Sequence, residues 1–361
     1  MRKFTAILSL VLALCLLAGC AGSPVIYYTD CTCPAVEYQP APSSPADSPA
    51  VTVPVTEGAL KTGLAIVTTL KDSTPASAEA EGVAKYDVTI AAVNVDDNGI
   101  IAACYIDSIG AEVKFGADGV ITSETASVAT KNELGDSYGM KAYGGATYEW
   151  YEQAAALADF ALGKTVEELR SGAVGESGKA ADADLATTAT IYLGGYVDAI
   201  EKAVANAQHL GAQSGDTLKV AVLASLSDSA GADAENAGNA QLNVDAAAIT
   251  MADDVITSAA IDSVQAKVAF DASGTITSDI SAPVQTKNEL GEAYGMKAWA
   301  NAKYEWNEQA ANFAAYITGK TAAEVSGIAI DEGTKPTDAD LSTSVTIAIG
   351  GFLALIAKAA Q

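Results

Sequence analysis

The pattern of hydrophobic and polar positions changes along the chain, first having the character of strands and then that of helices. The run at 64–70 is β-branched, and 86–95 is a second such run that ends at the turn residues 97–99. Runs bounded by Asp, Asn and Gly predict antiparallel strands joined by hairpins. Between residues 60 and 211, the predicted strands are 64–70, 86–95, 100–106, 113–115 and 120–122. The predicted helices of the same region are 148–162, a short helix starting at 165–168, and 191–207.

A polar segment of twelve residues occurs twice. Residues 130–141 (TKNELGDSYGMK) return 156 positions later as residues 286–297 (TKNELGEAYGMK), with ten of the twelve identical. A segment this polar is not needed to fill a core, so its return indicates that one domain was doubled. We call 130–141 and 286–297 the signature segments.

The order of elements around the signature segments predicts the fold class. We expect an α+β protein with two tandem repeats, each a small antiparallel β-meander followed by helices packed on one face. The link at 208–217 is short and contains two glycines. This link predicts repeats that can reorient while they remain close neighbours.

The first nineteen residues have the features of a signal peptide. Arg2 and Lys3 precede an apolar run at 4–17 that is too short to span a bilayer comfortably. The run ends in Leu-Ala-Gly-Cys20, which resembles the lipobox of bacterial lipoproteins and implies cleavage before Cys20 and acylation of that residue. The alternative is an ordinary secretory signal with a chance cysteine. Lipid chains on Cys20 would hold the protein at the cell membrane, facing outside the cytoplasm.

The remaining boundaries follow from a proline-rich stretch and from the repeat. Seven of the ten prolines lie in 21–57, so this stretch is expected to remain an extended tether. For Cys31 and Cys33, which lie in the tether, a redox pair, a second lipid site, intermolecular pairing and no role are all open. The expected organisation is a signal peptide at 1–19, a tether at 20–57, and repeat domains at 58–211 and 212–361.

Composition argues against several classes of function. The chain has 45 Asp+Glu against 20 Lys+Arg, a net charge of −25, so the backbone of a nucleic acid would be repelled. His209 is the one histidine and has no counterpart in the second repeat, which argues against a His-based triad or a shared multi-His metal site. Cys104 is expected to be a small core residue. With no catalytic group and no metal site indicated, we expect an electron carrier or a binding protein more than an enzyme.

The signature segments can be interpreted as a ligand site or as a structural loop. In a site, Lys131 and Lys141 would offer cations to a phosphate, and Tyr138 and Trp150 would offer stacking surface. In a structural loop, Tyr138 and Met140 would fill the core, and the glycines would take positive φ. The matching site residues of the second repeat are Lys287, Tyr294 and Lys297.

A hydroxyl-rich segment precedes the last predicted helix of each repeat. Asp184 and Thr187 are followed by Thr190, directly before the helix at 191–207. Free amides and the dipole at a helix N-terminus suit a phosphate, whereas plain capping by Asp and Thr needs no ligand. The matching residues of the second repeat are Asp340, Thr343 and Thr346.

These residues resemble the FMN-binding domain of membrane-associated redox proteins. That family has D-x-x-[ST]-G-A-[ST] at a helix start, after a D-x-x-G-x-I turn and a K-T-x-E-E-L segment. The chain has DDNGII at 96–101, KTVEEL at 164–169 and DLATTAT at 184–190, in that order. The resemblance implies that a flavin transferase joins the FMN phosphate to Thr190 and Thr346. The family's Gly is replaced by Thr188 and Ser344.

The expected function is a lipid-anchored extracytoplasmic FMN carrier in surface electron transfer, with the flavin supplying the chemistry. Its expected partners are the membrane, a flavin transferase and redox proteins. The alternative is a non-enzymatic surface lipoprotein that binds a partner or a small ligand through its paired repeats.

Overall fold

The computed structural model describes residues 58–361. The signal peptide, Cys20 and the tether with its two cysteines lie outside the described residues. Both repeats belong to one compact unit. Within residues 58–361, no helix is long and apolar enough to cross a membrane.

Each repeat is a three-stranded antiparallel meander followed by helices, which confirms the predicted α+β fold. The first repeat comprises β1 (Lys61–Thr69), β2 (Gly82–Val95), β3 (Ile101–Phe115), α1 (Lys131–Leu134), η1 (Gly135–Tyr138), α2 (Met140–Gly144), α3 (Trp150–Ala161), α4 (Val166–Ala173), α5 (Leu185–Thr188) and α6 (Gly194–Ala205). The second comprises β4 (Thr217–Ser225), β5 (Gly238–Ala252), β6 (Val255–Phe270), α7 (Lys287–Leu290), η2 (Gly291–Tyr294), α8 (Met296–Ala300), α9 (Trp306–Ile317), α10 (Ala322–Ser326), η3 (Leu341–Thr343) and α11 (Gly350–Ala359).

The third strand of each meander is longer than the sequence pattern indicates. The prediction of separate strands at 100–106 and 113–115 is wrong, because β3 is one strand of 15 residues. β2, with 14 residues, pairs with it along its whole length, and this pairing continues the strand past the polar residues Asp107 and Ser108. The segment predicted as a strand at 120–122 contributes one isolated bridge, between Phe115 and Ile121.

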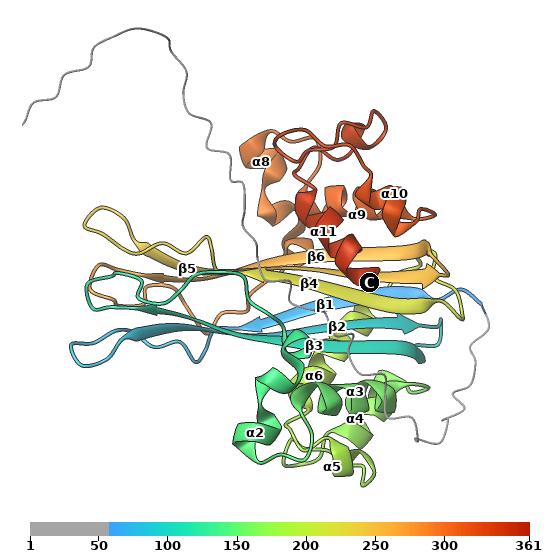
Figure 1. Cartoon of the computed structure of the whole chain (residues 1–361), viewed down its shortest axis with the longest axis horizontal. Helices are drawn as coiled ribbons and strands as arrows, with labels where there is room; N and C mark the ends of the chain where they lie inside the picture. Colours follow the sequence, from blue (N-terminus) through green and yellow to red (C-terminus); the bar gives the residue numbers. More distant parts are fainter. Residues whose placement is uncertain (1–57) are drawn as a thin grey trace, which may run out of the picture. The chain divides into compact units, whose positions relative to one another are not determined.

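The two sheets pack face to face, and helices cover their outer faces. One apolar cluster joins the sheets, with Ile66, Ile90 and Ile109 from the first sheet and Val222, Val244 and Val264 from the second. α3 and α6 cover the first sheet, and α9 and α11 cover the second. In Figure 1 the helices of the first repeat lie below the paired sheets and those of the second lie above them.

A stacked pair of phenylalanines joins the ends of the two sheets. Phe115 and Phe270, the last residues of β3 and β6, have ring centroids 4.0 Å apart and ring planes inclined by 7°. Gly82 and Gly238 are their cross-strand neighbours, and a Cβ on either glycine would lie 2.3 Å from the adjacent ring. Glycine is therefore required beside each ring for the close approach.

The repeats also exchange matching polar contacts, as the halves of a two-fold symmetric dimer do. Lys202 of α6 pairs with Glu289 of the second repeat at 2.7 Å, and the equivalent Lys358 of α11 pairs with Glu133 of the first. The turns after β3 and β6 each accept a backbone hydrogen bond from the other repeat, at 2.8 Å. The expectation that the repeats can reorient is therefore wrong, because a shared core and reciprocal contacts hold one arrangement.

The shared core predicts that both repeats unfold together. We expect Phe115→Ala to lower the free energy of unfolding by about 3–5 kcal/mol, the cost of removing a large aromatic from a core. Urea unfolding followed by circular dichroism should give one transition in both proteins. Val120→Ala, at a position that is 53% exposed, should change the free energy of unfolding by less than about 0.5 kcal/mol. Two separate transitions in the unsubstituted protein would contradict a shared core.

Candidate functional site

Each signature segment begins as a capped helical turn that is bound to the third strand. Thr130 Oγ1 accepts from the Glu133 N–H at 3.2 Å, and the Glu133 carboxylate accepts from the Thr130 N–H at 2.8 Å. The Asn132 N–H donates to Asp107 of β3 at 3.1 Å. The second repeat makes the same bonds between Thr286 and Glu289 and between Asn288 and Asp262.

The anchors Asp107 and Asp262 are buried carboxyl groups, only 2% and 4% exposed. Burial raises the pKa of each to about 6, although hydrogen bonds from the signature segment and from its own strand act in the opposite direction. Sequence reasoning missed both residues. An aspartate inside an apolar strand, at the same place in both repeats, was the available signal.

The lysines of the first signature segment are paired within their own repeat. Lys131 Nζ lies 5.2 Å from the ring centroids of both Tyr138 and Trp150, and Lys141 Nζ lies 2.8 Å from Glu152. In the second repeat, Lys287 lies over Tyr294 and Trp306, and Lys297 pairs with Glu308 at 2.7 Å. A bound phosphate would have to compete with these partners for the lysines.

The structural interpretation of the segment holds for its glycines but not for its tyrosine. Gly135 and Gly139 take positive φ angles of 49° and 82°. Tyr138 is 38% exposed and lies beside Lys131, so it does not fill the core. Met140 packs against the core of the first repeat from a partly buried position.

Two polar residues at the start of α3 connect the signature segment to the hydroxyl-rich segment. The buried carboxylate of Glu149 accepts from the N–H groups of Met140 and Lys141 at 2.7 and 2.9 Å. Gln153 is fully buried, and its Oε1 accepts from the Thr190 N–H at 2.8 Å and from the Ile191 N–H at 3.1 Å. Glu305 and Gln309 make the same contacts in the second repeat. Sequence reasoning missed both pairs, although their recurrence on matching helices marks them.

The hydroxyl-rich segment does not form the start of the last helix, so the prediction of a helix that begins at residue 191 is wrong. α6 begins at Gly194, and the backbone N–H groups of Thr190 and Ile191 before it donate hydrogen bonds to Gln153. The segment instead forms the short helix α5, whose first amides are accepted by the carboxylate of Asp182 rather than that of Asp184. The second repeat has the same arrangement, with η3 followed by α11.

The threonines implied as flavin acceptors lie at the surface. Thr190 and Thr346 are exposed, and their hydroxyls donate to Gln153 and Gln309 at 3.1 and 3.2 Å. The hydroxyls of Thr187 and Thr343 donate to the carbonyls of Asp184 and Asp340 at 2.7 and 2.8 Å. Within residues 58–361, no hydrogen bond or ion pair joins the signature lysines to these threonines, and the connection runs through the buried glutamines.

Each repeat presents one exposed aromatic side chain directly after its signature segment. Tyr143 is 91% exposed and Trp299 is 90% exposed. Each ring lies against a glycine of the segment, and a Cβ on Gly139 or Gly295 would lie 2.5 Å from it. The sequence analysis missed this pair because the two residues differ in identity, although both are aromatic at the same offset.

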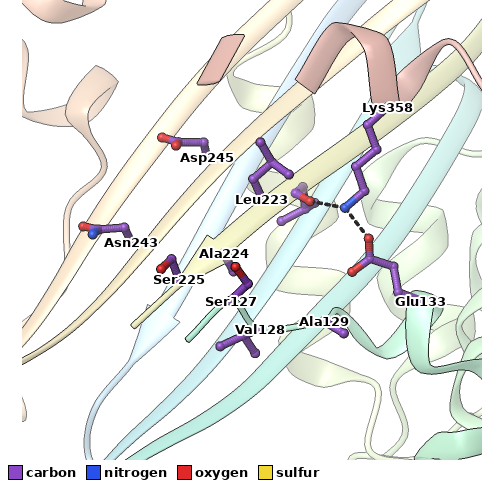
Figure 2. Close-up of a pocket in the computed structure, with 11 residues that line it drawn as sticks. Ser127, Val128, Ala129, Glu133, Leu223, Ala224, Ser225, Asn243, Asp245 and Lys358 are labelled. Atoms are coloured by element: carbon purple, nitrogen blue, oxygen red, sulfur yellow. Dashed lines mark hydrogen bonds and ion pairs between the residues drawn. The ribbon is translucent and has the colours of Figure 1, made fainter. Parts of the chain in front are cut away.

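Two cavities lie where the repeats meet. The smaller, of about 520 Å³, lies on the outer face of β4 and β5 beside the ion pair of Lys358 and Glu133. Lys358 also donates to the Val222 carbonyl. Figure 2 shows Lys358 reaching Glu133, with Asn243 and Asp245 further along the groove. The larger, of about 700 Å³, lies between β1 and the end of α6 in the first repeat and β6 and α9 in the second. We call it the seam cavity.

The single histidine and the cysteine of the first repeat each contact neighbouring residues. His209 bonds to Asp97 at 2.9 Å and lines the seam cavity. Cys104 packs against the core of the first repeat, where burial raises its pKa to about 12. Among residues 58–361, no cluster of three or more His, Cys, Asp and Glu is placed to hold a metal ion.

The raised pKa values of Asp107 and Asp262 predict a pH dependence of stability. From about pH 4 to about pH 6, the folded protein retains protons that the unfolded chain has released, so these groups lower the free energy of unfolding as pH rises. In the double variant Asp107→Asn, Asp262→Asn, one acceptor oxygen per site remains for the two backbone N–H groups that Oδ1 binds, the other oxygen becomes an NH2 donor, and titration is lost. Its free energy of unfolding relative to the unsubstituted protein should rise across this range, by up to about 3 kcal/mol per site.

Urea unfolding at a series of pH values measures this difference. Asp254→Asn, in the exposed turn between β5 and β6, is the control and should follow the unsubstituted protein. Parallel pH profiles for the double variant and the unsubstituted protein would contradict the assignment.

Comparison of the chain with protein-family models, with curated proteins and with solved structures finds no match. The resemblance to the FMN-binding domain therefore stays a prediction based on its three short motifs. The function has to be inferred from the side chains and their geometry.

Proposed function

We propose that the protein is a lipid-anchored extracytoplasmic binding protein that holds a neutral glycan through two exposed aromatic side chains, Tyr143 of α2 and Trp299 of α8. The observation that supports this proposal is the matched exposure of Tyr143 and Trp299, at 91% and 90%. Single exposed apolar residues are common on proteins. Here, two exposed aromatic rings occupy equivalent positions, and each packs against a glycine with positive φ. The two rings therefore form a repeated stacking surface.

The surroundings of each ring favour a sugar over an apolar partner. The residues two positions before the rings, Lys141 and Lys297, are charged and pair with Glu152 and Glu308, so the neighbourhood of each ring in sequence is polar. The C–H face of a sugar ring can stack on an aromatic ring while its hydroxyls bond to such polar neighbours. The net charge of −25 disfavours polyanionic polymers. A neutral polysaccharide therefore fits both the rings and the charge.

Two equivalent sites on one rigid unit suit a partner with repeating units. When both sites engage one polymer, the second contact is intramolecular, and avidity can exceed the affinity of one site by about 10²–10⁴-fold. Acylation at Cys20, expected from the lipobox, would keep the protein outside the cytoplasm, where such polymers occur. No chemical step is required of the protein in this function.

Retention on insoluble chitin, a neutral polysaccharide, tests the proposal. Tyr143→Ala and Trp299→Ala should each weaken retention at least about tenfold, and the double variant should lose it, because either single variant removes the bivalent contact. Tyr192→Ala, which removes an exposed aromatic outside α2 and α8, is the matched control and should bind normally. Insoluble cellulose, also a neutral polysaccharide, provides a second matrix. Binding that survives in the double variant on both matrices, or no binding of the unsubstituted protein to either, contradicts the proposal.

A second candidate, the FMN carrier, is favoured by one feature of the first repeat. Thr190 is exposed and therefore accessible to a flavin transferase, and two residues later Tyr192 is 71% exposed, where it could stack on a flavin ring. The second repeat has Ala348 at the position of Tyr192. We therefore place the flavin on the first repeat only.

Co-expression with a flavin transferase tests the flavin candidate. Intact mass and visible absorption should show one FMN unit, which Thr190→Ala removes and Thr346→Ala leaves in place. Tyr192→Ala should change the flavin spectrum without removing the mass increase. An unmodified, colourless protein excludes the covalent carrier and leaves the glycan proposal untouched.

A further inference from the structure

The seam cavity occurs at a junction whose symmetry-related counterpart has larger side chains. Its wall on α9 includes Asn307 and Ala315. The equivalent face of α3 has Tyr151 in place of Asn307 and Asp159 in place of Ala315. The two junctions arose from the same repeated sequence, so the differences between them indicate what the seam cavity accommodates.

The most informative difference lies on the third strand of each repeat. Tyr105 of β3 precedes the anchor Asp107 by two residues, and Ala260 of β6 precedes Asp262 by two. The Tyr105 hydroxyl donates to Asp107 Oδ2 at 3.2 Å and accepts from Asn132 Nδ2 at 3.1 Å. A phenol therefore bridges the anchor carboxylate and the signature amide in the first repeat.

The second repeat keeps this polar pair but has no phenol between its members. Asn288 Nδ2 donates to the Ile261 carbonyl at 2.9 Å, as Asn132 Nδ2 does to Ile106 in the first repeat. Among residues 58–361, Asn288 Nδ2 has no counterpart of the bond to Tyr105. Ala260, Asp262 and Asn288 all line the seam cavity. An exposed amide donor, Asn288, and a buried carboxylate acceptor, Asp262, thus face the space that a tyrosine ring fills in the other repeat.

A further polar group and the size of the cavity also indicate a ligand. Asn307 Oδ1 is buried and has no hydrogen-bond partner within residues 58–361, an arrangement that costs free energy unless a ligand or water satisfies it. The cavity volume of about 700 Å³ falls in the usual range of small-molecule sites, about 300–1,000 Å³. The lining includes two carboxylates and neither Lys nor Arg, which disfavours ligands with an acid group.

We propose that the seam cavity binds a small neutral phenol, a hydroxylated aromatic molecule, in the position that the Tyr105 side chain fills in the first repeat. The ligand hydroxyl donates to Asp262 and accepts from Asn288, and its ring lies over Ala260. Asn307 offers an acceptor to a second polar group on a larger ligand. This site is distinct from the exposed aromatic side chains of α2 and α8 and goes beyond the proposed glycan binding.

Titration with p-cresol, which has the side chain of tyrosine, tests the site directly. We expect one binding site by calorimetry and ligand-observed NMR, and at least about tenfold weaker binding of toluene, which lacks the hydroxyl. Ala260→Tyr introduces the phenol of the first repeat and should abolish binding. Tyr105→Ala removes that phenol and should raise the stoichiometry from one to two.

Controls keep the outcome independent of folding and of the glycan proposal. Circular dichroism establishes that each variant is folded, and Asn288→Ala, expected to weaken p-cresol binding at least about tenfold, replaces Ala260→Tyr if that variant does not fold. Trp299→Ala should leave p-cresol binding unchanged. The proposal is overturned if the unsubstituted protein does not bind p-cresol, if toluene binds equally well, if binding survives in folded Ala260→Tyr, or if Tyr105→Ala adds no site.

Discussion

Neither three-stranded sheet can expose its inner face to water, because that face is a continuous apolar surface from Leu64 to Phe115 in the first repeat and from Val222 to Phe270 in the second. The helices of each repeat follow its own sheet in sequence and cover only the outer face. The second sheet is therefore the cover for the first. The stacked phenylalanines, the reciprocal lysine–glutamate pairs and both cavities all follow from that packing.

The two signature segments have nearly identical sequences largely because each connects a sheet to its covering helix. Each segment links a sheet to the helix that covers it, and buried polar groups fix it at both ends. Asp107 holds its start, Glu149 accepts its amides, and Gln153 extends the network to Thr190. A change within such a network leaves a buried donor or acceptor unpaired, which constrains the residues strongly. The exposed aromatic after each segment has no such framework role, which is why we assign function to it.

Duplication provides an internal comparison that a single domain lacks. Where the repeats agree, as in the caps and the anchors, the residues maintain the fold. Where they differ at equivalent partly buried positions, as at Tyr105 and Ala260, the first repeat has a large side chain and the second has a cavity. The two hydroxyl-rich segments differ in the same way, because an exposed aromatic ring, Tyr192, follows the first and Ala348 stands at the equivalent position after the second.

The sequence by itself determined the duplication, the α+β class and the order of strands before helices in each repeat, because these depend on periodicity and on contacts within a few residues. It could not determine that β3 runs unbroken, since pairing with β2 decides that. Nor could it show that Gln153, 37 and 38 residues away in sequence, accepts hydrogen bonds from the backbone N–H groups of Thr190 and Ile191. The last helix therefore begins at Gly194 and not at residue 191. The packing of the two sheets, and with it the seam cavity, was decided only by tertiary structure. Burial of one apolar face against another depends on area and shape, and neither face specifies its partner in the sequence.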